Sequence, residues 1–297
     1  MGVVVQTIGF GIAAGAVISL GAVGFTVQFG ISNVLNITYG AFMTLSAYFG
    51  YALLNRGLDV WLALLLVAVA MALISVLFNR VFLGPLQRRG AGFVSVVIGT
   101  VAAGIILQGV IVILVGPGAI TYGAQFGTTV SALGFTFTVA QLIIIGMTLA
   151  LMLGLHLLLT RTRIGRAMRA TSTNRTVARA CGIRTERIID LTWLLTGFLC
   201  GAAGVALAVT TVTFDFSLGS IFLIYMIAAA VLGGIAQPYG AMIGGIVVGV
   251  ASQLGAAYWS PAYQDVVAFT ILIIVLLIRP RGLFAAAGVT RRNLSAT

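Results

Sequence analysis

The sequence predicts an all-α fold, a polytopic bundle of eight or nine transmembrane helices that forms a single domain over residues 1–297. Of the 297 residues, 61% are hydrophobic and only 7% are charged, whereas a soluble globular protein carries about a quarter charged residues. Charge-free runs cover residues 1–55 and 90–160, and each is longer than the roughly 20 residues that one crossing needs. Too few charges remain to solvate a soluble surface of this size.

Breaks between the apolar runs place the individual spans. Residues 1–55 are long enough for two crossings, separated by the polar residues 32–36. If residues 1–29 cross only halfway, the count is eight rather than nine. The glycine-rich stretch 116–134 predicts a loop. We expect the remaining spans over residues 60–79, 93–115, 139–159, 191–211, 219–235, 240–257 and 264–278.

The positive charges gather on one side of this predicted bundle. Nine spans place the loops 80–92, 160–190 and 236–240 and the C-terminus together, and these hold every arginine except Arg56. Residues 160–190, named here the Arg-rich segment, carry eight of the 16 basic residues. Because membrane proteins keep Arg-rich loops in the cytoplasm, the C-terminus is predicted to be cytoplasmic. The net charge of +11 therefore indicates topology rather than nucleic-acid binding.

Small residues recur at helical spacing, which lets helix backbones approach closely in lipid. The richest example is the predicted hairpin VLGGIAQPYGAMIGGIVVGV over residues 231–250. We expect close helix packing at Gly233, Gly234, Gly240, Gly244, Gly245 and Gly249. The alternative is that glycine is simply common in membrane helices.

Five segments together resemble the membrane permeases of the branched-chain amino acid ABC importer family, and the similarity covers nearly the whole chain. They are LNITYG (35–40), PLQRRG (85–90), GRAMRAT followed by TVARACGI (165–183), the hairpin 231–250, and RPRGLF (279–284). Each segment alone is a weak signal. Their order and spacing give the resemblance its specificity.

The resemblance implies a transport subunit rather than an enzyme, located in the bacterial inner membrane. It would import branched-chain or related amino acids by alternating access, as half of a permease dimer fed by a solute-binding protein. Partner ATPase subunits would bind ATP and Mg, since this chain has no G-x-x-x-x-G-K-[ST] phosphate loop. Three alternatives stay open: a permease of the same family for urea, short amides or another small polar metabolite, an ion-coupled secondary transporter, and a passive channel or membrane scaffold. The secondary transporter needs an ionisable residue inside the membrane, for which only His156 and acidic residues at the span edges are available.

The Arg-rich segment is predicted to contact the ATPase through two short helices, over residues 164–170 and 174–180. Asn174 can cap the second helix and Gly182 can end it. In the family, a coupling helix has a Glu-Ala-Ala core, which corresponds here to residues 176–178, so the Glu is absent. We expect partner contact at Gly165, Arg166, Arg169, Thr176, Ala178 and Gly182. The alternative is that the arginines only fix topology and touch lipid head groups.

Polar residues between the first two spans are candidates for the translocation pathway. They are Asn33, Asn36, Thr38, Tyr39 and Gly40. A discontinuous helix at this point would expose backbone groups to a ligand. The His and Glu of the family's segment correspond here to Tyr39 and Ala41. The alternative is a cytoplasmic turn that binds no ligand.

Overall fold

The computed structural model describes residues 2–122, 129–132, 135–258, 260, 263–278 and 282. Helices account for most of the described chain. In order they are α1 (Gly2–Ser32), α2 (Thr38–Leu54), α3 (Val60–Phe78), the π-helical turn η1 (Asn79–Leu83), α4 (Gly84–Arg88), α5 (Phe93–Val115), α6 (Val139–Arg161), α7 (Arg163–Thr173), α8 (Arg175–Ala180), α9 (Thr185–Thr211), α10 (Leu218–Gly233), α11 (Pro238–Tyr258) and α12 (Gln264–Ile278). Four short strands complete the list, β1 (Ile120–Thr121), β2 (Thr129–Ala132), β3 (Phe135–Thr138) and β4 (Thr213–Phe214).

Every predicted span corresponds to a helix. Within the described ranges, six helices are long and apolar enough to cross a membrane, namely Gln6–Ser32, Val60–Arg88, Phe93–Val115, Val139–Arg161, Thr185–Thr211 and Pro238–Tyr258. Helices α10 and α12 are apolar but shorter, and α2 has 17 residues. The predicted break between the first two spans is confirmed, because α1 ends at Ser32 and α2 begins at Thr38.

Two sequence-based boundaries differ from the structure. Helix α9 begins at Thr185, so the last residues of the Arg-rich segment are helical rather than loop. The predicted loop 116–134 contains strands: β1 pairs antiparallel with β4, Ile120 opposite Phe214, and β2 pairs with β3. These two small β-ladders provide hydrogen-bond partners for backbone N–H and C=O groups that lie outside the helices.

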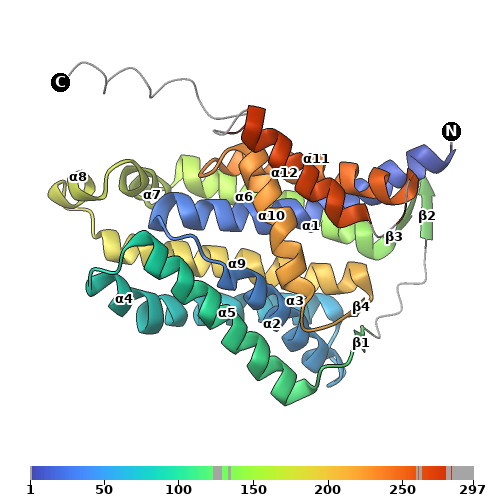
Figure 1. Ribbon diagram of the computed structural model, residues 1–297, viewed down its shortest axis with the longest axis horizontal. Coiled ribbons are helices and arrows are strands. Elements are labelled where there is room, and N and C mark those ends of the chain that lie inside the picture. Colours follow the sequence, from blue (N-terminus) through green and yellow to red (C-terminus); the bar gives the residue numbers. More distant parts are fainter. Residues whose placement is uncertain are drawn as a thin grey trace.

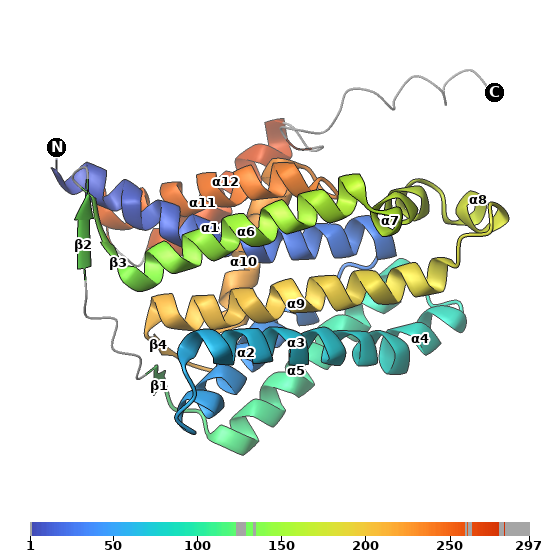
Figure 2. The ribbon, with the colours of Figure 1, turned by 180° about the vertical axis from the view of Figure 1, so that it is seen from behind.

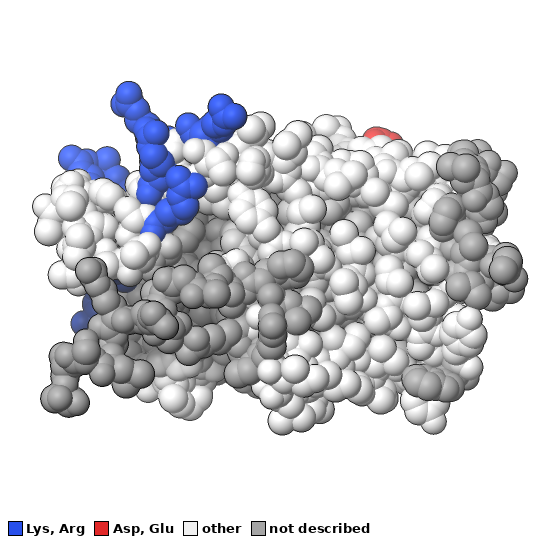
Figure 3. Space-filling model, turned by 90° about the horizontal axis from the view of Figure 1, so that it is seen from above, with Lys and Arg blue, Asp and Glu red and all other residues white. Residues whose placement is uncertain are grey.

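The long helices run between two distinct ends of the molecule (Figures 1 and 2). One end, called the basic end, carries α4, α7 and α8, and the arginines visible in Figure 3 gather there. The opposite end, called the strand end, carries the four strands and the N-terminus. There, Asp59 caps α3 by accepting a hydrogen bond from Trp61 N at 3.1 Å. The charge segregation expected from the sequence is thus visible in the described part of the fold.

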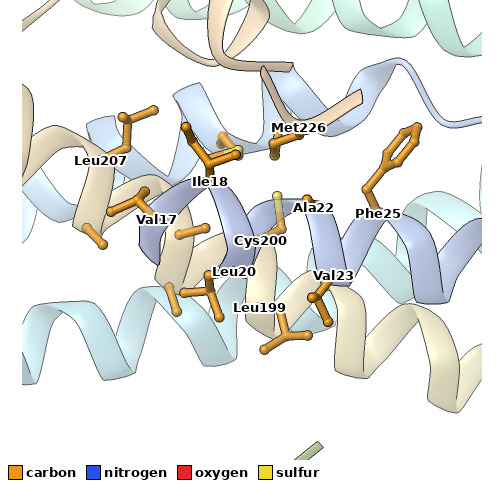
Figure 4. Close-up of a cluster of buried hydrophobic side chains, with 14 of the residues drawn as sticks. Val17, Ile18, Leu20, Ala22, Val23, Phe25, Leu199, Cys200, Leu207 and Met226 are labelled. Atoms are coloured by element: carbon orange, nitrogen blue, oxygen red, sulfur yellow. The ribbon is translucent and has the colours of Figure 1, made fainter. Parts of the chain in front are cut away.

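Helix α1 is central to the core. Its residues Val17, Leu20 and Val23 are at most 1% exposed. They pack in the same cluster as Leu199 of α9 and Met226 of α10 (Figure 4). Helix α1 therefore has protein rather than lipid around most of its length.

The contact between α1 and α11 brings the two backbones together. A Cβ atom on Gly11 would lie 2.7 Å from Val250 Cα, and one on Gly15 would lie 2.9 Å from Ile246 Cα. A Cβ on Gly249 would collide with the backbone of Gly15. Ser19 Oγ adds a hydrogen bond of 2.7 Å to Met242 O across the same contact. No side chain larger than hydrogen fits at these glycines without moving a helix.

The hairpin of α10 and α11 has the same close packing. A Cβ on Gly240 would meet the Gly233 carbonyl, and one on Gly244 would meet the Ala229 carbonyl. A Cβ on Gly245 would lie 2.6 Å from Ser19 Cα of α1. Gly234 adopts φ +101° at the turn between the two helices, a conformation that favours glycine.

We predict that Gly249→Ala destabilises the protein by about 1–3 kcal/mol, because the added methyl group forces α1 and α11 apart. The matched control is Gly109→Ala in α5, where a Cβ would meet nothing within 4 Å. At that position alanine should leave stability unchanged or raise it by up to about 1 kcal/mol. Thermal unfolding midpoints of the two purified variants in detergent measure the difference. Equal midpoints would show that the α1–α11 contact is not tight in solution.

Candidate functional site

The Arg-rich segment forms a compact pair of helices at the tip of the basic end. Thr162 Oγ1 accepts a hydrogen bond from Gly165 N at 3.0 Å and caps α7. Asn174 Oδ1 accepts from Thr176 N at 3.0 Å and from Val177 N at 3.1 Å and caps α8. Gly182 then ends α8 with φ +81°. The predicted helix pair is confirmed, as are the predicted roles of Asn174 and Gly182 at the two ends of α8.

Burial divides the six predicted contact residues into two groups. Gly165 is buried, and a Cβ there would lie 2.5 Å from Leu159 Cα of α6. Ala178 is only 4% exposed. Gly165 therefore packs α7 against α6, and neither buried residue is free to contact a partner. The remaining four are exposed, namely Arg166, Arg169, Thr176 and Gly182.

Val177 presents an apolar side chain at the end of the tip, with 56% of it exposed. It lies in the stretch that corresponds to the family's Glu-Ala-Ala core, but it is not among the six contact residues predicted from the sequence. A helix of six residues is too short for hydrophobic periodicity to show which face is buried. The structure shows that Ala178 faces inward and Val177 outward.

A polar network connects the tip to the bundle. Arg179 Nε donates to Thr185 Oγ1 at 2.7 Å, which ties α8 to the start of α9. On the next turn of α9, Asp190 accepts from Arg80 Nη2 at 2.8 Å and from Asn79 Nδ2 at 3.2 Å. Both partners of Asp190 belong to η1, so the network links the tip to α3 through α9.

The same network lines a cavity of about 440 Å³ at the basic end. Glu186 lies 3.9 Å from both Arg88 and Arg179. Burial lowers the pKa of Arg175, and the neighbouring Arg179 lowers it further. The two acidic residues of the Arg-rich segment, Glu186 and Asp190, thus offset part of its positive charge. No local pattern predicts the pairing of Arg80 with Asp190, since 110 positions separate them.

The candidate pathway residues lie where the chain leaves α1 and enters α2. Ile37 N donates to Thr100 Oγ1 at 3.2 Å, and Thr38 Oγ1 donates to Thr100 O at 2.5 Å. Thr100 is the eighth residue of α5, about 10 Å from its start at 1.5 Å per residue. Helix α2 therefore begins inside the bundle, and the non-helical segment that precedes it is bonded to α5.

The five candidate residues have different surroundings. Asn33 is exposed with φ +53°, Tyr39 packs against Phe25 with ring centroids 5.9 Å apart, and Gly40 contacts Gly219 of α10. Asn36 is buried, with only 1% of it exposed. Its side-chain amide has no hydrogen-bond partner within the described chain. A contact of any of them with substrate stays a prediction.

Two further features of the sequence are His156 and the segment RPRGLF. His156 Nδ1 lies 2.8 Å from Tyr239 Oη, which joins the last turns of α6 to the start of α11. The segment RPRGLF (279–284) falls outside the described residues except for Gly282.

Comparisons with known proteins agree on one family. The family described as branched-chain amino acid transport system / permease component matches residues 7–276. The high-affinity branched-chain amino acid transport system permease protein BraD of Pseudomonas aeruginosa is 31% identical over 292 residues, with 92% of this chain and 93% of BraD covered. The corresponding permease LivH of Escherichia coli is also 31% identical, with 92% of each chain covered.

A further relative is also a branched-chain amino acid transport permease, and one solved structure shares the fold. The probable branched-chain amino acid transport permease protein LivH of Methanocaldococcus jannaschii is 30% identical, with 88% of this chain and 86% of the relative covered. The structure titled PsaBC from Streptococcus pneumoniae in complex with Fab has a TM-score of 0.52 and 16% identity, with 92% of each chain covered. At that identity the likeness concerns the fold alone.

We predict that Asn174→Ala loosens α8, because two backbone N–H groups lose their acceptor. Loss of an N-cap costs about 1 kcal/mol, which makes local opening roughly fivefold more frequent. Trypsin cleavage after Arg175 and Arg179 in the purified protein should accelerate by that factor. Asn174→Ser is the control, since serine keeps an acceptor at the cap. Equal cleavage rates for the alanine and serine variants would contradict this role of Asn174.

Proposed function

The chain belongs to the branched-chain amino acid permease family, and on this premise we propose that it is the membrane-spanning subunit of an ABC importer for branched-chain or related amino acids. Cytoplasmic ATPase subunits would bind ATP and Mg and drive transport, and a second permease subunit, identical or homologous, would complete the pathway. A solute-binding protein would deliver the substrate. The chain itself would catalyse no reaction.

The capped helix pair α7–α8 is the observation that carries this proposal. It is held on the bundle by buried Gly165 and by the bond of Arg179 to Thr185, and it presents Val177 and four exposed positions outward. An apolar side chain surrounded by arginines at the tip of a membrane protein is suited to dock in a groove of a soluble partner. We assign Arg161, Arg163, Arg184 and Arg187, all exposed, to topology and lipid contact.

The proposed orientation follows from charge. The basic end would face the cytoplasm together with the C-terminus, and the strand end would face outward. In the bacterial inner membrane the chain would cross eight or nine times as one domain over residues 1–297. The unbroken helix α1, with 31 residues, favours the count of nine.

The proposed mechanism is alternating access. Movement of the ATPase subunits would act on α7 and α8, and the network of Arg179, Thr185 and Asp190 would transmit it to α9 and α3. Because α9 packs on α1 and α2, its displacement would reach the interrupted segment before α2. Asn36, buried without a partner in the described structure, would then meet water or substrate.

We predict that Val177→Arg weakens assembly with the ATPase subunit while leaving membrane insertion intact. A charge at the centre of an apolar contact lacks a partner, and the loss of one central contact weakens binding roughly tenfold or more. The control is Ser172→Arg, which adds the same charge to an exposed position of α7. Co-purification of tagged ATPase with each variant measures the effect. Unimpaired co-purification of Val177→Arg would refute docking at α8.

A further inference from the structure

A cavity of about 410 Å³ opens at the strand end, between α1, α9, α10, α11, α12 and β4. Its volume falls within the range of small-molecule sites. Two of the chain's five acidic residues, Asp215 and Asp265, lie on its wall. None of the described residues that line it is basic. The cavity is therefore a place where positive charge is favoured.

Hydrogen bonds hold both carboxylates in position. Asp215 Oδ1 accepts from Ser217 N at 2.9 Å and from Ser217 Oγ at 2.6 Å. Asp265 Oδ1 accepts from Tyr225 Oη. In both residues the described bonds use Oδ1, so the other carboxylate oxygen, Oδ2, is left to receive a donor from a ligand.

Ser252 of α11 is an independent sign that the cavity accepts a ligand. This residue lines the cavity and is only 1% exposed. Its hydroxyl has no hydrogen-bond partner within the part of the chain that the structure describes. A buried hydroxyl without a partner is unfavourable, and a polar ligand in the cavity would satisfy it. Ile18, Leu207 and Phe222 contribute apolar side chains to the wall.

We propose that this cavity binds an aliphatic amino acid as it enters from the strand end, with Asp215 and Asp265 receiving its ammonium group. The apolar wall contacts the aliphatic side chain, and Ser252 donates its hydroxyl hydrogen to the carboxylate. This inference rests on the proposed import of amino acids and assigns the outer substrate site to particular residues.

Thiol modification tests the charge of the cavity without ATP or partner subunits. Cys181 and Cys200 are first replaced by serine and alanine, and Thr211→Cys places a reporter at an exposed lining position. The measured quantity is the rate of modification by a cationic methanethiosulfonate reagent divided by the rate of modification by an anionic one. Each rate is normalised to the reaction of the same reagent with free mercaptoethanol.

A negative potential of about one kT in the cavity raises this ratio roughly sevenfold. In Asp215→Asn and Asp265→Asn the ratio should fall, because asparagine keeps the hydrogen bonds but not the charge. A ratio that both substitutions leave unchanged would refute the proposed electrostatics.

Protection of the same cysteine tests the ligand. L-Leucine and 3-methylbutylamine, which both carry an ammonium group, should slow modification in the Thr211→Cys protein and lose this effect in the asparagine variants. The carboxylate 4-methylpentanoate has a similar aliphatic chain without the ammonium and should protect much less. Equal protection by the amine and the carboxylate, or protection by neither leucine nor the amine, would overturn the proposal. Failure of ATP-driven uptake would refute the importer function and leave this result unaffected.

Discussion

The backbone contact between α1 and α11 is the constraint on which the rest of this structure depends. Lipid removes the hydrophobic force between helices, so close van der Waals contact has to hold them together. Gly11, Gly15 and Gly249 let α1 and α11 touch backbone to backbone. The tight hairpin at Gly233 and Gly240 then fixes α10 against α11. With α9 packed on its remaining side, α1 becomes a buried axis that runs from the strand end to the basic end.

This axis separates two chemically different ends. The basic end holds the capped pair α7–α8 and the bonds of Asp190 to Arg80 and Asn79. The strand end holds a cavity with two carboxylates and none of the arginines of the described chain on its wall. Under the proposed function, the ATPase subunits act on the basic end, and substrate enters at the strand end. The interrupted segment before α2, bonded to Thr100, lies between them.

Local signals in the sequence were sufficient to predict the helices and the caps at Asn174 and Gly182. Charge-free runs and capping residues can be recognised within a short stretch of sequence. Contacts between distant segments could not be predicted in this way, such as Arg80 with Asp190, β1 with β4, and Asp265 with Tyr225. The early start of α9 was missed because Glu186 and Asp190 resemble a solvated loop. Their charges are instead paired with arginines across the basic end. The burial of Ala178 depends on how α8 folds against α7 and the start of α9, which composition does not reveal.

Uptake by the complete complex tests the importer function most directly. The chain, its ATPase subunits and its solute-binding protein would be reconstituted in proteoliposomes, and entry of radiolabelled leucine, isoleucine, valine, urea and acetamide would be measured with and without ATP. We expect uptake of the branched-chain amino acids, and we expect it to require ATP hydrolysis. Uptake that continues without ATP would contradict the importer function. ATP-dependent uptake confined to urea or acetamide would contradict the assigned substrate class.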